Sequence, residues 1–156
     1  MIAHGGLIAR RIGGDWRGVL IEGASGVGKS DLALRAIEAG FTLVADDRVL
    51  LFVTAGRLFG RAPDPLAGLI EARGVGVVRR PSRPFAAVAL RAFCVAAPAV
   101  VERMAPGLKA ERLGVLVPTL DIWPLEASAP AKLAAALEHL GAGAQQGYLA
   151  RFAPPP

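Results

Sequence analysis

Hydrophobic and polar positions follow two different periods along the 156-residue chain. Short apolar runs that are bounded by glycine and proline favour strands. Two pairs of such runs are separated by glycine-containing turns, which predicts two β-hairpins. Further strands are expected at 41–47, within 83–97 and within 115–126, where Pro118 and Pro124 favour an edge or a bulge. The hairpins are expected at 7–12 with 17–23, and at 48–53 with 57–63.

Three segments instead carry the helical period or a helix-start signal. In 30–40 the apolar residues share one face before Gly40, and in 128–141 leucines recur on one face after a possible Ser128 cap. Asp64 and Pro65 predict a short helix over 64–74. Interleaved strands and helices indicate an α/β or α+β class with a mixed sheet flanked by helices. Length favours a single domain over 1–152, followed by a frayed tail at 153–156.

Composition narrows the function classes. Apolar residues make up 53% of the chain and charged residues 20%, and no apolar run reaches the roughly 18 residues of a membrane span. Cys94 is the only cysteine, so we expect a buried, unpaired thiol and a reducing cytoplasm. The net charge is +5, and five arginines between Arg73 and Arg91 are interrupted by no acid. Few aromatic residues accompany them, which disfavours nucleic acid; phosphate binding, an acidic partner or a solvated basic face stay open.

The segment 23–30 reads GASGVGKS and fits the phosphate-loop pattern G-x-x-x-x-G-K-[ST]. An apolar strand precedes it and a helix follows, so the helix N-terminus points at the bound anion. Lysine suits the β- and γ-phosphates, and the serine hydroxyl suits Mg²⁺. The motif therefore predicts a nucleoside triphosphate site, with ATP and Mg²⁺ as cofactors. The expected binding residues are Gly23, Ala24, Ser25, Gly26, Val27, Gly28, Lys29 and Ser30.

A second chemical signal is the acid pair Asp46–Asp47, which ends the apolar run LVA. Two adjacent carboxylates at a core edge are costly unless a cation or a shared proton offsets them. Strand alternation places them on opposite sides, but a kink could direct both toward the phosphate loop. One acid would then hold Mg²⁺ while the other accepts a hydroxyl proton during phosphoryl transfer. The sequence does not decide which acid is the base, and a plain turn remains an alternative.

Three blocks together, GASGVGKS, LVADDRV and IEARGVGVV, resemble the catalytic domain of the HPr kinase/phosphorylase family. The resemblance runs from His4 to about Ile122. It implies a P-loop kinase fold of the HPr kinase and phosphoenolpyruvate-carboxykinase type. It also implies an ATP-dependent serine kinase acting on the phosphocarrier HPr or a paralogue, and a hexameric assembly.

The resemblance also implies individual roles. His4 matches a histidine near the transferred phosphate, Asp46 and Asp47 match the family's acid pair, and Glu71 matches a metal contact. Arg103 is the preferred counterpart of a catalytic arginine, and Arg112 is its rival. The catalytic set implied is His4, Lys29, Asp46, Asp47 and Arg103, and the metal set is Ser30, Asp46 and Glu71.

Two departures from the family pattern change the expectation. The family's N-terminal domain is not seen ahead of His4, which suggests a short form. In addition, the family segment V-R-P-G-R-N, which serves dephosphorylation, corresponds here to WPLEASAPAK without an arginine. Lost arginines mean lost phosphate-binding forks, so we predict weak or absent phosphorylase activity. Two other hypotheses remain: a phosphotransferase with a small-molecule acceptor, and a nucleotide-binding regulatory module without chemistry.

Overall fold

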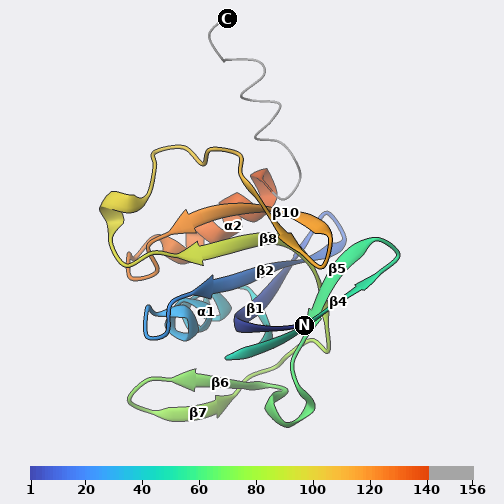
Figure 1. Cartoon of the computed structure of the whole chain (residues 1–156). Coiled ribbons are helices and arrows are strands. Elements are labelled where there is room, and N and C mark those ends of the chain that lie inside the picture. The colour runs from blue at the N-terminus through green and yellow to red at the C-terminus, as the bar shows by residue number, and fades with distance from the viewer. Residues whose placement is uncertain (141–156) are drawn as a thin grey trace, which may run out of the picture.

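The computed structural model describes residues 1–140, which form a mixed β-sheet with both helices on one face, and a separate small hairpin (Figure 1). No helix in this part of the chain is long and apolar enough to span a bilayer. The strands are β1 (Ile2–Ile12), β2 (Asp15–Gly23), β3 (Thr42–Ala45), β4 (Arg48–Thr54), β5 (Arg57–Arg61), β6 (Leu69–Ala72), β7 (Gly76–Arg79), β8 (Ala86–Cys94), β9 (Lys109–Arg112) and β10 (Val115–Ile122). The helices are α1 (Lys29–Glu38) and α2 (Ala129–His139), with 3₁₀ turns at η1 (Asp64–Leu66) and η2 (Pro98–Val100).

Both predicted hairpins are confirmed. Strands β1 and β2 pair antiparallel from Gly5 opposite Glu22 to Ile12 opposite Asp15, and Gly13 and Gly14 supply the positive-φ turn. Strands β4 and β5 pair in the same manner across a turn at Ala55 and Gly56, both with positive φ. Both long predicted helices are also present, and Gly40, with φ of 111°, lies just beyond the end of α1.

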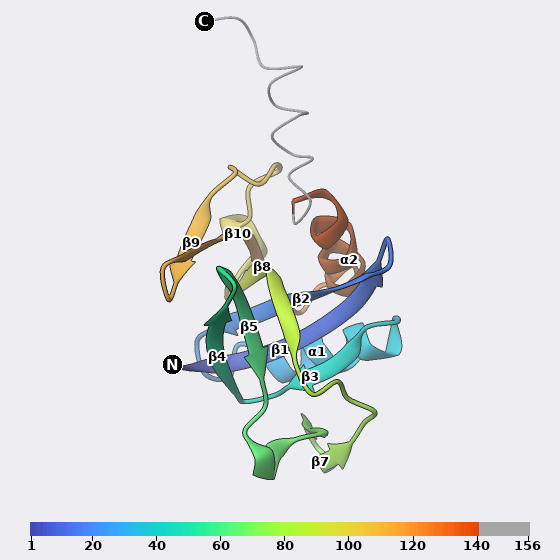
Figure 2. The same cartoon turned by 90° about the vertical axis from the view of Figure 1, so that its right-hand side faces the viewer.

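Two long strands change partners and thereby bend the sheet. The start of β1 pairs with β4 while the rest pairs with β3 and β2. The start of β8 pairs with β5 while the rest pairs in parallel with β2 and β10. Strands β2, β1, β4, β5 and β8 consequently close into a ring, and β10 and β9 continue the sheet beyond β8 (Figure 2).

This bend divides the apolar residues into two cores. One core lies between the sheet and the helices, and it includes Ile8, Ile21 and Leu133. The other fills the ring, and it includes Leu7 and Val49. Gly60 is required there because a Cβ at that position would lie only 2.7 Å from the Leu7 side chain.

The predicted helix over 64–74 is wrong. The structure has the short turn η1 and then the hairpin β6–β7, which pairs Glu71 with Val77. Gly68, with φ of 77°, ends the turn, and Ile70 is buried between less buried neighbours as in a strand. Glu71 therefore lies on a strand rather than on a helix.

Two smaller expectations also need correction. Strand β10 is not an edge strand, because it pairs with β9 up to Pro118 and with β8 from Thr119 onward. The imino nitrogen of Pro118, which has no hydrogen to donate, thus falls where the pairing changes sides. Ser128 occupies the N-cap of α2 but makes no side-chain capping bond. The tail expected at 153–156, and the last part of the domain expected over 1–152, lie outside the described residues.

Candidate active site

The phosphate-loop motif connects the end of β2 to the start of α1. Gly26 and Gly28 have φ of 78° and 112°, values that side-chain-bearing residues rarely adopt. The first-turn amides of α1 have no intrahelical acceptor and face the loop, as in an anion site. The Lys29 Nζ donates to the carbonyls of Gly23 at 2.9 Å and Ala24 at 2.8 Å, which holds the ammonium over the loop.

Asp46 closes the other side of this loop. Its side chain is buried, and one carboxylate oxygen accepts a hydrogen bond from the Ser30 hydroxyl at 2.8 Å. The second oxygen accepts the Glu71 backbone N–H at 3.0 Å. Asp46 therefore joins α1, β3 and the β6–β7 hairpin, and both of its oxygens have a partner.

Asp47 differs from Asp46 in its exposure and in its contacts. Its φ of 66° marks a left-handed turn between β3 and β4, and its side chain is 76% exposed. Its carbonyl accepts the N–H of Gly5 at 3.1 Å, while its carboxylate lies 3.7 Å from the Arg48 guanidinium. Both acids nevertheless line the cavity of the phosphate loop.

The loop and the acid pair line one cavity of about 400 Å³. Gly5, Ser25, Asp31 and Arg73 contribute to the same lining. Asp31 is paired with Arg35 at 2.9 Å and Asp47 with Arg48 at 3.7 Å, so two carboxylates and two cations of the lining remain without a salt bridge to any described residue. A divalent cation that binds with a polyphosphate would balance the negative charge that the polyphosphate adds.

The residues present fit a magnesium ion. Mg²⁺ takes one or two protein oxygens and fills its octahedron with water and phosphate oxygens. Ser30 and Asp46 already place a hydroxyl and a carboxylate 2.8 Å apart beside the loop, and Glu71 lines the same cavity. Within residues 1–140 no group of three or more His, Cys, Asp or Glu side chains could hold a metal unaided.

The remaining predicted residues, His4, Arg103 and Arg112, do not line this cavity. His4 is exposed on β1 opposite Arg48, and its neighbour Gly5 lines the cavity. Arg103 lines a separate cavity that shares no lining residue with the first. Arg112 is bound by the Glu22 carboxylate at 2.7 Å, together with Arg91. Neither candidate arginine therefore lines the cavity of the acid pair.

The five arginines from Arg73 to Arg91 do not form one continuous surface. Arg73 lines the cavity, Arg80 lies 3.7 Å from the Glu38 carboxylate, and Arg83 stacks on Trp16 at 4.0 Å. Of the five arginines from Arg73 to Arg91, only Arg73 borders this cavity. No ion pair joins it to Glu71 within the described residues.

The segment that follows β10 packs on the phosphate loop. A Cβ at Gly28 would lie 3.2 Å from the Leu125 side chain and 3.6 Å from Pro124. Arg35 of α1 donates to the carbonyls of Pro124 and Glu126, the latter at 3.1 Å. Residues 124–126 are thus held beside the loop by the Arg35 guanidinium, which binds their carbonyls, and by apolar contacts with Gly28.

Sequence reasoning had not assigned a role to Gly5 or to Asp31. Gly5 is needed because a Cβ there would lie 2.1 Å from the Ile21 carbonyl oxygen across the strand pair. The doubled glycine after His4 was a usable signal. Asp31 directly follows the motif serine, but its pairing with Arg35 four residues later already explains it locally.

Fold and cavity together define an α/β protein in which a G-x-x-x-x-G-K-S loop faces a paired acid. Residues 3–91, more than half of the chain, match the family model of the HPr Serine kinase C-terminal domain. The chain therefore belongs to this family.

Individual relatives agree with this assignment. An HPr kinase/phosphorylase of Brevibacillus brevis is 38% identical over 110 residues, which are 70% of this chain and 35% of the relative. One from Clostridium tetani is 46% identical over 65 residues, 42% of this chain and 21% of the relative. The aligned parts thus span between about a fifth and a third of the length of these relatives. The solved Hpr(Ser) kinase/phosphatase of Coxiella burnetii superposes with a TM-score of 0.75 at 25% identity, over 97% of this chain and 96% of that one.

Proposed function

We propose that this protein is an ATP-dependent serine kinase that phosphorylates HPr or a related phosphocarrier in a reducing cytoplasm. The observation that carries the proposal is the single cavity in which the phosphate loop, Asp46 and Asp47 meet. Relatives named HPr kinase/phosphorylase support the choice of acceptor.

The roles follow from the contacts. Lys29 and the amides of the loop bind the β- and γ-phosphates of ATP. Ser30 and Asp46 hold Mg²⁺, with Glu71 as a further contact, and the bound ion neutralises charge on the transferring phosphoryl group. Asp46 is buried and doubly hydrogen-bonded, so it suits the metal rather than a mobile proton.

Asp47 is the better candidate for the base. Its carboxylate is exposed at the cavity, where the serine of a protein substrate has access. It can accept the hydroxyl proton as the serine oxygen attacks the γ-phosphorus. His4 and Arg103 remain candidates that rest on the family resemblance.

The test incubates the protein with Mg²⁺, γ-labelled ATP and purified HPr, beside a panel of small-molecule acceptors. We expect label on one serine of HPr, located by mass spectrometry, and none on the metabolites. Asp47→Asn should lower transfer by at least about 100-fold, the typical contribution of a general base, with ATP binding retained. Asp15→Asn, at the exposed first position of β2, is the matched control. Full transfer by Asp47→Asn would assign the base elsewhere, and no label on HPr would refute the proposal.

We further propose that the reverse reaction is weak or absent. Residues 123–128 offer no arginine, and the Arg35 guanidinium that contacts them is already occupied by two carbonyls of this segment. A phosphate ion attacking phosphoserine therefore lacks a guanidinium fork on this side. Phosphoserine-HPr should keep its phosphate when incubated with the protein and inorganic phosphate, followed by gel shift over hours. Rapid dephosphorylation would contradict the prediction.

A further inference from the structure

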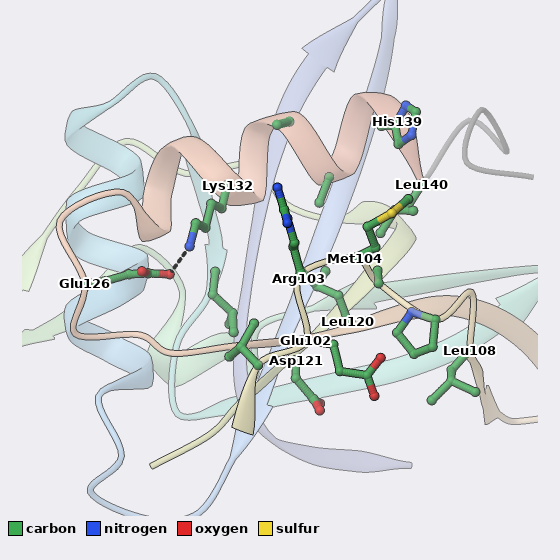
Figure 3. Close-up of a pocket in the computed structure, with 16 residues that line it drawn as sticks. Glu102, Arg103, Met104, Leu108, Leu120, Asp121, Glu126, Lys132, His139 and Leu140 are labelled. Atoms are coloured by element: carbon green, nitrogen blue, oxygen red, sulfur yellow. Dashed lines mark hydrogen bonds and ion pairs between the residues drawn. The ribbon is translucent and has the colours of Figure 1, made fainter. Parts of the chain in front are cut away.

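A second cavity, of about 470 Å³, lies between residues 101–108, β10 and α2 (Figure 3). Its lining is largely apolar, with Met104 and Leu108 from the loop, Leu120 from β10 and Leu140 next to α2. A volume of this size suits a small organic molecule. The phosphate-loop cavity shares none of these residues.

Large apolar side chains are left exposed where the loop borders this cavity. Met104 is 46% exposed and Leu108 is 61% exposed. Exposed apolar side chains grouped around a hollow are more typical of a binding site than of a bare surface. The apolar body of a ligand would remove part of this surface from water.

The charges around the cavity are separated. The Arg103 side chain extends from the loop toward α2, whereas Glu102 and Asp121 extend to the opposite side (Figure 3). Lys132 is already paired with Glu126 at 2.6 Å. Arg103 makes no hydrogen bond or ion pair with any residue in the described part of the chain.

We propose that this cavity binds a small organic anion with an apolar body and one carboxylate, which Arg103 recognises. A guanidinium presents two parallel N–H donors that match a carboxylate. The apolar lining accommodates the rest of the molecule, and a simple inorganic anion gains nothing from it. The proposal concerns binding alone and does not depend on the kinase activity proposed above.

The experiment titrates the full chain with 3-phenylpropionate by isothermal calorimetry, without nucleotide. The neutral control ligand is 3-phenylpropan-1-ol, which has the same apolar body. We expect saturable one-site binding of the acid with a Kd of roughly 0.1–1 mM and about fivefold weaker binding of the alcohol, the effect of one exposed charge pair. Equal affinities for the two compounds, or no saturable binding of the acid, would overturn the proposal.

Variants locate the site. Arg103→Gln should weaken binding of the acid about fivefold and leave the alcohol unchanged, while Arg11→Gln, on an exposed hairpin position, should change neither. Ala135→Trp fills the cavity from an exposed position of α2 and should abolish both, with an unchanged unfolding transition as proof of folding. Lys29→Ala should have no effect, and loss of binding in that variant would place the ligand at the phosphate loop instead.

Discussion

At the scale of residues, one kinked turn makes two chemically identical side chains unequal. Asp46 is buried and accepts two hydrogen bonds, whereas Asp47 adopts φ of 66° and stays exposed. A buried acceptor with two donors is costly to alter, because a buried donor that is left without an acceptor pays its desolvation penalty with no hydrogen bond in return. Stability is therefore expected to depend on Asp46 more than on Asp47.

This difference predicts that Asp46→Asn destabilises the fold while Asp47→Asn does not. The asparagine amide has one carbonyl oxygen and can accept a hydrogen bond from only one of the two donors. Its NH₂ group, itself a donor, would face the other. We expect the free energy of unfolding in urea to fall by about 1–3 kcal/mol, with magnesium-dependent ATP binding also weakened. Asp15→Asn serves again as the control. Unchanged stability of Asp46→Asn would mean that the carboxylate is not held as described.

Cys94 gives a second prediction at this scale. The thiol is 2% exposed, and burial raises its pKa from 9.0 to about 11, although the Lys29 charge offsets part of the effect. The thiolate is the reactive form, so iodoacetamide at pH 8 should label the native protein far more slowly than the urea-unfolded protein. Equal rates would contradict the burial.

The raised pKa of Cys94 also makes the stability of the fold depend on pH. An acid whose pKa is raised in the folded state favours folding only while it stays protonated. The contribution of Cys94 is therefore complete below pH 9 and is lost as the pH rises from 9 to about 11. Cys94→Ala should show a smaller loss of unfolding free energy over this range than the parent protein.

At the scale of elements, local periodicity was informative wherever neighbours in sequence make the element. The β1–β2 and β4–β5 hairpins and both long helices follow from turn residues and apolar spacing. The region 64–74 failed because a good helix-start signal competed with a strand that exists only by pairing with β7 and by burying Ile70. The sequence predicted no strand at β9, because four residues are too few to show a hydrophobic period.

Helix α1 follows the phosphate loop and also contacts the segment that packs on it. Arg35 connects it to residues 124–126, which in turn pack on Gly28. Arg35→Met should keep much of the aliphatic packing but leave two carbonyls without a donor. We expect the unfolding free energy to fall by about 1–3 kcal/mol and ATP to bind more weakly, both measurable by thermal shift with and without Mg·ATP. Arg11→Met is the control, and an unchanged nucleotide response would show that the segment does not support the loop.

At the scale of the whole molecule, the fold brings distant segments to one place. The cavity gathers residues from the N-terminal strand, the loop before α1, the turn after β3 and the β6–β7 hairpin. The pairing of β1 with β3 and β4 places its glycines beside that turn. A separate apolar cavity arises between β10 and α2 from the same arrangement.

Assembly belongs to this scale as well. Resemblance to the family leads us to predict a hexamer of the 16.1-kDa chain, about 97 kDa in total. Size-exclusion chromatography with light scattering measures this mass directly at several protein concentrations. A monomer at every concentration, with full phosphotransfer, would separate the activity from the family's assembly.

The sequence by itself determined the phosphate loop, the acid pair, the hairpins and the long helices, because each depends on residues close together in the chain. Only the tertiary structure decided that Asp46 is buried and Asp47 exposed, that Glu71 lies on a strand, and that Arg103 lies at a different cavity from Lys29. Those outcomes depend on pairings between residues far apart in sequence, whose free energies no local pattern contains.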